Sequence, residues 1–251
     1  MTLGPAQPRV APRADIVQPR CGPRSPRLGP VAVLAATEPD LALLASELGI
    51  AAPRRLFTSR LYFEPDAAVS LVGPAIGAPY AAMLLETLAA WGARTLIFVG
   101  WCGAIAAGVP IGRIVVPHSA LVDEGTSRHY IPDAPTAYPS RDLATRLADA
   151  CTAADLPFST GGVWTTDALF RENPAKVERC RALGAVAVDM EASALFTVAA
   201  FLGIEAAALL IVSDDLSAMR WEPGFNLPRF AQAREGACRL VAELARRLAG
   251  C

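Results

Sequence analysis

Short runs of apolar residues alternate along the chain with longer segments in which apolar residues recur every three or four positions. The first pattern predicts strands covered on both faces, and the second predicts helices that bury one side. The predicted strands span residues 31–36, 56–63, 67–72, 95–99, 114–116, 159–164, 185–188 and 204–212. The predicted helices span residues 39–48, 79–91, 141–154, 174–183, 190–202 and 226–248.

The order of these elements predicts the fold class. Strands that alternate with helices of ten or more residues form a largely parallel sheet with helices on both faces. No linker rich in glycine, proline or serine divides residues 31–251, and no internal repeat is visible. We therefore expect one α/β domain over residues 31–251.

Residues 1–30 differ from the rest of the chain in composition. They hold seven of the 21 prolines, five arginines and one acidic residue, Asp15, which gives a net charge of about +4. Because prolines interrupt regular structure and few apolar residues are present, we expect a disordered Pro/Arg-rich arm. A transit peptide is also Arg-rich and acid-poor, but this segment lacks an amphipathic period. No secretory signal pattern is present, and we expect a cytoplasmic protein.

Composition excludes several functional classes. The chain of 251 residues is 53% hydrophobic and carries a net charge of −1, which excludes a disordered protein and argues against a nucleic-acid partner. The six cysteines form no CxxC pair and only two histidines occur, so neither a disulfide framework nor a metal site is expected. The apolar stretch 195–212 contains Gly203 and Glu205, which favours a buried helix, a turn and a strand over a membrane span.

Polar residues follow four of the predicted strands, where ligands bind in open α/β sheets. These segments are 37–40, 100–103, 189–191 and 213–215. Glycine patterns for nucleotide binding are absent: neither GxxxxGK nor GxGxxG occurs, and the only lysine is Lys176. A P-loop NTPase is therefore excluded, and a nicotinamide-binding site is unsupported.

Two of these segments offer carboxyl groups with more than one interpretation. Asp189 can cap the helix that follows, and Glu191 can favour its positive end. That helix is apolar nearly all round, so a carboxylate at its start faces either protein or a ligand such as a sugar hydroxyl. Asp214 and Asp215 can form a solvated turn. If partly buried, their mutual repulsion raises one pKa and supplies an acid near neutral pH.

Three strings taken together resemble the purine nucleoside/uridine phosphorylase superfamily over about residues 31–248. They are Asp123–Tyr130 (DEGTSRHY), Asp189–Leu195 (DMEASAL) and Val212–Asp215 (VSDD). The first string is most similar to the uridine phosphorylase branch. The resemblance implies a three-layer α/β/α sandwich with a central mixed, largely parallel and partly barrel-like sheet.

The resemblance also implies an activity. Members cleave the N-glycosidic bond of a nucleoside, and most use phosphate as a co-substrate to give a base and a (deoxy)ribose 1-phosphate, without a cofactor. By this resemblance Met190 packs on the ribose, Glu191 binds its hydroxyls beside Asp189, and Asp214 protonates the departing base. The residues around Thr166 and Phe170 flank the base.

The acceptor end departs from the family pattern. Leu41 stands where phosphorolytic members carry an arginine, and Phe98 and Trp101 stand beside Gly100 where an arginine and a threonine are usual. With Gly100, Trp101 lies where it narrows or closes the acceptor site. Arg55 matches an arginine that a neighbouring subunit lends to the phosphate, which implies a dimer-based homo-oligomer such as a hexamer.

These departures keep two alternatives open. The string Ala35–Asp40 is similar to the start of the nucleosidase branch, including futalosine hydrolases, in which a carboxylate near Asp40 activates water. Asp40 can equally be an ordinary acid in a first helical turn. A non-catalytic nucleoside-binding protein is the second alternative. The base, purine or pyrimidine, stays open, as does the role of His129 as a structural or ligand-contacting residue.

Overall fold

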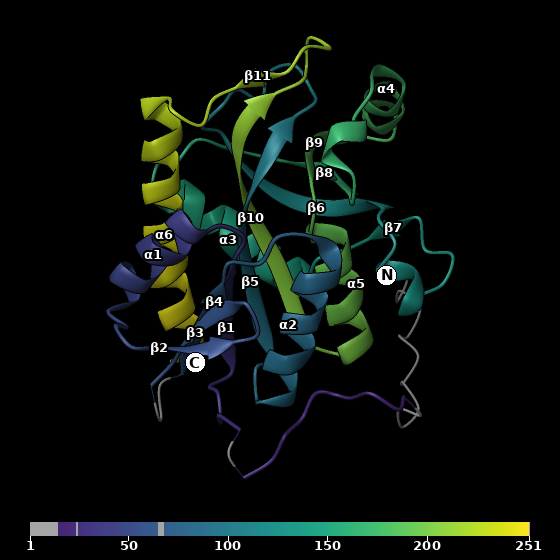
Figure 1. The fold of residues 1–251 in the computed structure, drawn as a ribbon. Helices are drawn as coiled ribbons and strands as arrows, with labels where there is room; N and C mark the ends of the chain where they lie inside the picture. Colours follow the sequence, from purple (N-terminus) through teal and green to yellow (C-terminus); the bar gives the residue numbers. More distant parts are fainter. Residues whose placement is uncertain (1–14, 24, 65–67, 251) are drawn as a thin grey trace, which may run out of the picture.

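The structure is a computed structural model that describes residues 15–23, 25–64 and 68–250. Its strands form one 11-stranded sheet in the order β11-β10-β6-β8-β9-β5-β1-β4-β3-β2, with β7 beside β6 (Figure 1). The strands are β1 Val31–Ala35, β2 Pro53–Leu56, β3 Ser59–Tyr62, β4 Val69–Gly73, β5 Thr95–Ala104, β6 Ile114–Asp123, β7 Thr136–Ala137, β8 Phe158–Thr166, β9 Ala185–Asp189, β10 Glu205–Asp215 and β11 Glu222–Pro223.

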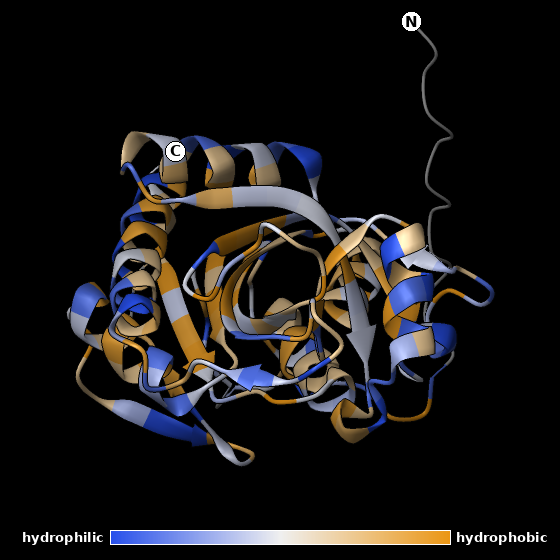
Figure 2. Cartoon of the chain, turned by 90° about the horizontal axis from the view of Figure 1, so that it is seen from above, coloured by the Kyte–Doolittle hydropathy of each residue, from blue (hydrophilic) through white to orange (hydrophobic). Residues whose placement is uncertain are grey.

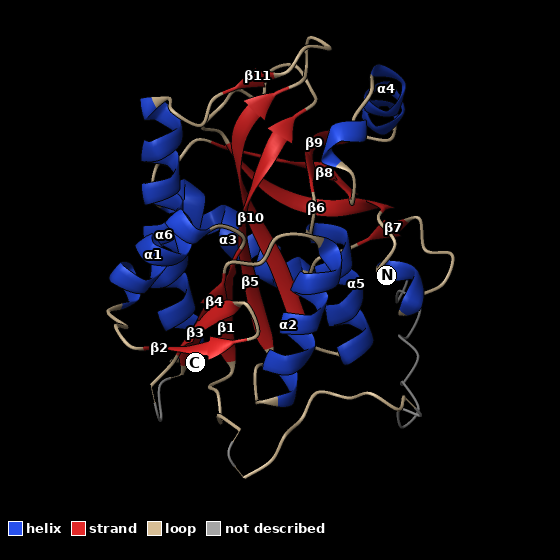
Figure 3. Ribbon diagram, in the orientation of Figure 1, coloured by secondary structure: helices blue, strands red, loops and turns tan. Residues whose placement is uncertain are grey.

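Helices cover both faces of this sheet (Figure 3). The α-helices of the described residues are α1 Glu38–Leu48, α2 Ala78–Ala90, α3 Arg141–Ala153, α4 Pro174–Ala182, α5 Ala192–Leu202 and α6 Pro228–Ala249, and the 3-10 helices are η1 Ser127–His129 and η2 Leu169–Arg171. Helix α2 packs on α5, and α1 packs on α6 at the opposite face. The mixed α/β fold with a central sheet agrees with the sequence-based expectation.

Part of the sheet closes into a barrel. Strand β5 pairs in parallel with β10 on one side and antiparallel with β9 on another. Strand β10 pairs with β6, β6 with β8, and β8 with β9, which completes the ring. Seen from above, strands curve around a central axis with helices outside (Figure 2). Closure brings the ends of β5, β8, β9 and β10 to one place.

The continuous apolar stretch 195–212 forms a buried helix, a turn and a strand, as predicted. Every residue from Ala192 to Ala199 is buried, because α5 lies between α2 and the barrel. Gly203 ends the helix in a left-handed conformation with φ of 68°, and β10 begins two residues later. None of the helices in the described parts of the chain combines the length and apolarity needed to cross a membrane.

Strand β5 is longer than the pattern predicts. It continues through the segment 100–103, which we had expected to end the strand. Glycines fit here because neighbouring groups approach closely: a Cβ on Gly100 would lie 2.7 Å from the ring of Phe98, and one on Gly103 would lie 2.6 Å from the side chain of Leu216. These glycines serve packing inside a strand and do not form a turn.

The segment 56–63 also differs from the prediction of one continuous strand. It is not one strand but part of a hairpin, in which β2 and β3 pair antiparallel with Leu56 opposite Ser59. The reversal places Phe57 at φ of 54°, a conformation that is rare for an aromatic residue. No glycine or asparagine marks this turn, which is why the sequence pattern did not reveal it. Residues 65 and 66, between the strands predicted over 56–63 and 67–72, lie outside the described residues.

The described part of the N-terminal segment has neither helix nor strand. It lies along the end of α2, where the indole Nε1 of Trp91 donates a hydrogen bond to the carbonyl of Arg20 (2.8 Å). The backbone N–H of Leu28 in turn donates to the carbonyl of Trp91 (2.9 Å). The division into an arm over residues 1–30 and a domain over 31–251 stays a prediction.

Candidate functional site

Asp189 caps the buried helix α5. Its carboxylate accepts hydrogen bonds from the backbone N–H groups of Ala192 (2.6 Å) and Glu191 (3.1 Å) and from the hydroxyl of Thr165 (2.6 Å). Burial raises the pKa of this carboxyl, although the three donors act in the opposite direction. Asp189 is thus the helix cap that the sequence allowed, and it fixes where the chain turns into Met190 and Glu191.

Glu191 joins the starts of two helices. One of its carboxylate oxygens accepts a hydrogen bond from the backbone N–H of Gly77, 2.6 Å away, at the start of α2. Gly77 has a φ of 89°, which favours glycine at this position. The side chain of Glu191 is buried, and this burial together with the nearby charge of Asp189 raises its pKa. The backbone amides of Gly77 and Met190 favour its carboxylate form, and its oxygens retain acceptor capacity for a ligand hydroxyl.

A third carboxyl, Glu124, completes this group of buried acids at the start of α5. It accepts hydrogen bonds from the backbone of Thr126 (2.5 Å) and Ser127 (3.1 Å) and from the hydroxyl of Ser193 (3.0 Å). Its negative charge contributes to the raised pKa of Asp189. Within the described residues, no ion pair reaches Glu124, Asp189 or Glu191. Backbone amides and hydroxyls hold these acids in place of cations.

Asp214 lies at the same end of the barrel. Strand β5 separates it from β9, since Gly103 pairs with Val188 on one side and with Asp214 on the other. Burial raises the pKa of the Cys102 thiol, and the negative charges of both Asp189 and Asp214 raise it further. The fold therefore brings the acid segments 189–191 and 213–215 to neighbouring strand ends.

Two donors hold the carboxylate of Asp214. The hydroxyl of Ser213 donates to Oδ1 (2.5 Å), and the indole Nε1 of Trp221 donates to Oδ2 (2.9 Å). Trp221 itself is 60% exposed, on the loop that leads into β11.

Asp40 has a different environment. Its side chain is completely buried, and Oδ1 accepts a hydrogen bond from Nε of Arg234 on α6 (2.6 Å), with which it forms an ion pair. Oδ2 accepts hydrogen bonds from the indole Nε1 of Trp101 (2.6 Å) and from the hydroxyl of Thr37 (3.0 Å). The carboxylate is thus held by three side-chain donors. Its role as a base that activates water stays a prediction.

An aromatic cluster packs around Trp101 and Arg234, which are hydrogen-bond partners of Asp40. The ring of Trp101 packs edge-on against Phe230, with 5.0 Å between centroids, and lies 6.0 Å from Phe225. The guanidinium of Arg234 lies 5.3 Å from the ring of Trp101. Phe225 also neighbours Trp221, at 6.4 Å. The cluster therefore runs from the acid at position 40 to the acid at position 214.

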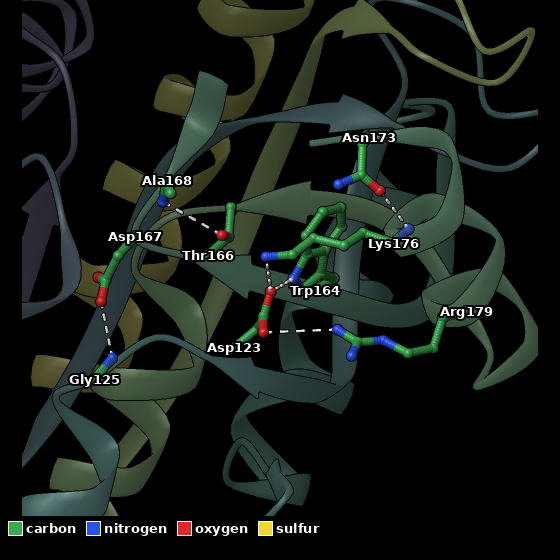
Figure 4. Close-up of polar contacts among 9 residues, drawn as sticks. All are labelled: Asp123, Gly125, Trp164, Thr166, Asp167, Ala168, Asn173, Lys176 and Arg179. Carbon is green, nitrogen blue, oxygen red and sulfur yellow. Dashed lines mark hydrogen bonds and ion pairs between the residues drawn. The ribbon is translucent and has the colours of Figure 1, made fainter. Parts of the chain in front are cut away.

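The loop after β8 is tied at both ends (Figure 4). At its start the carboxylate of Asp167 accepts a hydrogen bond from the N–H of Gly125 (2.8 Å), and at its end Asn173 caps α4 by accepting one from the N–H of Lys176 (3.0 Å). The amine of Lys176 donates to Asp123 (2.9 Å), and Arg179 lies 3.6 Å from the same carboxyl. These contacts hold residues 167–173 over the ends of β6 and β8.

The remaining predicted site residues have varied positions. Met190 is half-buried between the two acids, and Thr166 is buried at the end of β8, where its hydroxyl accepts a bond from the N–H of Ala168 (3.3 Å). Phe170 is 92% exposed. Two further predicted residues are exposed as well, Arg55 on the edge strand β2 and His129 in η1.

Sequence reasoning missed several partners of these acids. Arg234 pairs with an acid 194 positions earlier, and Trp221 bonds to Asp214 from a loop that carries no motif. Glu172 is half-buried, and its pKa is raised to about 7 by burial and by the charge of Asp214, against the charge of Lys176. Glu124 lies inside a string that the resemblance used, although no role was assigned to it.

Among the described residues, the acids named above form no metal-ion cluster, and none of them lines the cavity at helix α5. In the described ranges, no group of three or more histidine, cysteine, aspartate or glutamate side chains is arranged to hold a metal ion. A cavity of about 400 Å³ lies instead at the C-terminal part of α5, lined by residues that include Tyr138, Phe196 and Glu205.

Comparison with known proteins identifies the family. The sequence profile described as "Phosphorylase superfamily" matches residues 30–246. A purine nucleoside phosphorylase of the DeoD type from Bacillus cereus (strain B4264) is 35% identical over 152 residues, which is 59% of this chain and 64% of that protein. The equivalent protein of Bacillus cytotoxicus is 34% identical with the same coverage. The match thus spans just under two thirds of the length of these curated relatives.

A solved structure agrees with this assignment. The crystal structure of AMP nucleosidase from Bacteroides thetaiotaomicron superposes with a TM-score of 0.71 and 25% sequence identity, covering 90% of this chain and 95% of that chain. The mixed α/β fold with a central sheet is therefore shared with this nucleosidase. The chain belongs to the phosphorylase superfamily, which comprises nucleoside phosphorylases and nucleosidases.

Proposed function

We propose that this protein cleaves the N-glycosidic bond of a purine nucleoside, with phosphate as the acceptor, and releases the free base and a pentose 1-phosphate. The observation that carries the proposal is the position of the two acid segments. Glu191, at the start of a buried helix, and Asp214, across Gly103 from β9, lie at neighbouring strand ends of one barrel. The purine assignment rests on the names of the curated relatives.

The proposed roles follow from the environment of each group. Glu191 is buried and retains acceptor capacity, so it binds ribose hydroxyls and holds the sugar while positive charge develops at its anomeric carbon. Met190 packs on the sugar, and Asp189 orients both residues through its cap. Asp214 faces the base with the ring of Phe170 and with Thr166 at its sides. Acid assistance to a leaving group is typically worth about 10²–10⁴-fold in rate.

Arg55 supports a phosphate site that forms between subunits. It is exposed on β2, and its Nε donates to the carbonyl of Phe57 (3.0 Å) in the same hairpin. β2 ends the sheet, four strands from β5 in strand order, so within one chain this arginine is separate from the acids. We infer that it serves a neighbouring copy in a dimer-based homo-oligomer, as the family resemblance implies, in the cytoplasm.

Hydrolysis is the second candidate, because the acceptor end is crowded. Trp101 occupies it with the bulk of an indole, and Asp40 neutralises the guanidinium of Arg234. Arg60 on β3 is paired with Glu38 in the same way. Cations that are already paired bind a phosphate dianion weakly, which favours water as the acceptor. Asp40 is then the candidate base, although three donors already hold its carboxylate.

One assay separates these functions. The purified protein is incubated with inosine, adenosine and uridine, with and without inorganic phosphate, and the free base is quantified by chromatography. Release that requires phosphate supports phosphorolysis, and release at an equal rate without phosphate supports hydrolysis. Binding measured by calorimetry without any base release would replace both with a nucleoside-binding role.

A further inference from the structure

Residues 124–130, which follow strand β6, connect the barrel to both helices whose starts meet at Glu191. At the far end of this segment the phenolic hydroxyl of Tyr130 donates a hydrogen bond to Glu86 of α2 (2.6 Å). The ring of Tyr130 packs edge-on against Phe201 of α5, with 5.3 Å between centroids. The segment therefore contacts α2 and α5 together.

Glu124, at the near end of the segment, holds the first turn of α5. Its Oε1 accepts a hydrogen bond from the hydroxyl of Ser193 (3.0 Å). Its Oε2 accepts hydrogen bonds from the backbone N–H groups of Thr126 (2.5 Å) and Ser127 (3.1 Å), which fix the direction of the carboxylate. Because Glu124 and Ser193 are both buried, water does not replace the bond between them. Ser193 is thus held by an acceptor of fixed orientation.

A chain of hydrogen bonds continues from Ser193 to Glu191. The backbone N–H of Ser193 donates to the hydroxyl oxygen of Thr165 (2.9 Å), and that hydroxyl donates to Oδ1 of Asp189 (2.6 Å). Oδ2 of Asp189 in turn accepts a hydrogen bond from the N–H of Glu191 (3.1 Å). All four residues are buried. The ends of β6, β8 and β9 are therefore joined to the start of α5, and a shift of Ser193 changes the position of Glu191.

The residue after Glu124 holds the loop that we propose to flank the base. The backbone N–H of Gly125 donates a hydrogen bond to the carboxylate of Asp167 (2.8 Å), at the start of the loop after β8 (Figure 4). Glu124 and Gly125 are consecutive in the chain. Adjacent residues thus hold the sugar end and the base end of the proposed site.

We propose that Glu124 and Ser193 are positioning residues, whose hydrogen bond sets the start of α5 so that Glu191 meets the ribose hydroxyls. This inference rests on the proposed function and adds two residues to it. Because both side chains are buried, they act through Glu191 and not by contact with the substrate. Their effect on the reaction therefore depends on the hydroxyl groups of the sugar.

The test compares Ser193→Ala with Ser127→Ala. Ser193→Ala removes the hydroxyl that donates to Glu124 and retains the backbone N–H that donates to Thr165. The hydroxyl of Ser127 is also buried but has no hydrogen-bond partner among the residues that the structure describes, so its removal leaves these bonds intact. Ser193→Cys, which keeps the size of the side chain but offers only a weak donor, is a second variant should the alanine variant fail to fold.

Two substrates separate positioning of the sugar from a general loss of structure. With inosine, kcat/KM of Ser193→Ala should fall by about 10- to 100-fold, and that of Ser193→Cys should fall in the same direction. With 2′,3′-dideoxyinosine, which lacks the hydroxyls that Glu191 would bind, both variants should stay within a few-fold of wild type. Equal losses on the two substrates, or a profile like that of Ser127→Ala, overturn the proposal.

A measurement that needs no activity separates this inference from the proposed function. The backbone N–H of Gly77 on the other helix donates to Glu191 (2.6 Å), so its hydrogen exchange reports the position of that carboxylate. Ser193→Ala should accelerate this exchange by about tenfold or more, whereas Ser127→Ala should not, and the amides of β1 should exchange as in wild type in both variants. Unchanged exchange at Gly77 refutes the positioning role. A wild-type protein that releases no base refutes the proposed function, even if Gly77 responds as expected.

Discussion

Asp40 and Glu191 are both buried carboxyl groups at helix starts, yet their surroundings differ. Asp40 is paired with a guanidinium and accepts three side-chain hydrogen bonds, one of them from an indole. Glu191 receives a backbone amide and lies beside another acid. Burial alone therefore does not mark a reactive group. The partners decide whether a carboxylate is committed to the fold or remains free to bind a ligand.

The largest effect is expected for Asp40→Asn. This change leaves the guanidinium of Arg234 without its counter-charge in a site where the acid side chain is 0% exposed. Breaking a buried ion pair from one side typically costs about 3–5 kcal/mol, so we expect a loss of that order in the free energy of unfolding. Urea denaturation followed by circular dichroism measures it.

Glu47→Gln is the matched control for this prediction. Glu47 pairs with Arg239 at 3.7 Å, but both side chains are substantially exposed. Exposed pairs contribute about 0–1 kcal/mol, so this variant should unfold almost as the wild type does. If Asp40→Asn matched Glu47→Gln in stability and yet abolished base release, Asp40 would be a reacting group, and the contrast with Glu191 would disappear.

Glu191→Gln tests the other half of the comparison. The amide retains the size of the side chain but replaces one oxygen with an NH2 group that only donates, so the site loses an acceptor for the sugar hydroxyls. Misplacement of a bound reactant by about 1 Å can lower the rate about 10²-fold, and we expect kcat/KM to fall by at least this factor. Glu243→Gln, exposed on α6, is the control. Full turnover in Glu191→Gln would remove the ribose assignment.

The two indoles that bond to acids offer a finer comparison. Trp101→Phe keeps a ring against Phe230 but removes the donor to Asp40, and hydrogen bonds to charged groups are worth about 1.5–3 kcal/mol. Trp221→Phe removes the donor to Asp214 from a side chain that is 60% exposed, where water replaces the bond. The midpoint temperature of thermal unfolding should therefore fall more in Trp101→Phe than in Trp221→Phe. The reverse order would show that the site at Asp40 is open to water.

The pH dependence of stability tests the raised pKa values directly. The raised pKa values of Asp189, Glu172 and Glu191 mean that the folded chain holds protons that the unfolded chain has lost. Their effect on the free energy of unfolding therefore lowers stability as pH rises, over the window from about 5 to about 8. Each such proton contributes at most about 1.4 kcal/mol per pH unit.

Urea unfolding at pH 5, 6, 7 and 8 measures this slope. Glu191→Gln should flatten it, whereas Glu243→Gln should not. The lowered pKa of Asp123 acts only at pH values below its ordinary range and does not enter this window. Stability that increased from pH 5 to pH 8 would contradict the assignment of raised pKa values to these acids.

Much of the fold followed from local patterns, whereas much of the site did not. The burial of Glu191 was predictable because the helix after it is apolar on every side. Its partner Gly77, 114 positions away, meets it only through the packing of α2 on α5. Arg234 and Trp221 were missed for the same reason. The hairpin at Phe57 was missed because no glycine or asparagine marks the turn and an aromatic residue rarely adopts this backbone conformation.

Lys176, which pairs with Asp123, offers a way to label the loop after β8 chemically. The chain contains one lysine, so an amine-directed acylating reagent meets a single ε-amino group besides the α-amine of the polypeptide. Acylation would cancel the cation that favours the charged form of Glu172, so that Glu172 keeps its proton to higher pH. A single covalent label on Lys176 would thus mark the loop after β8 and raise the pKa of Glu172.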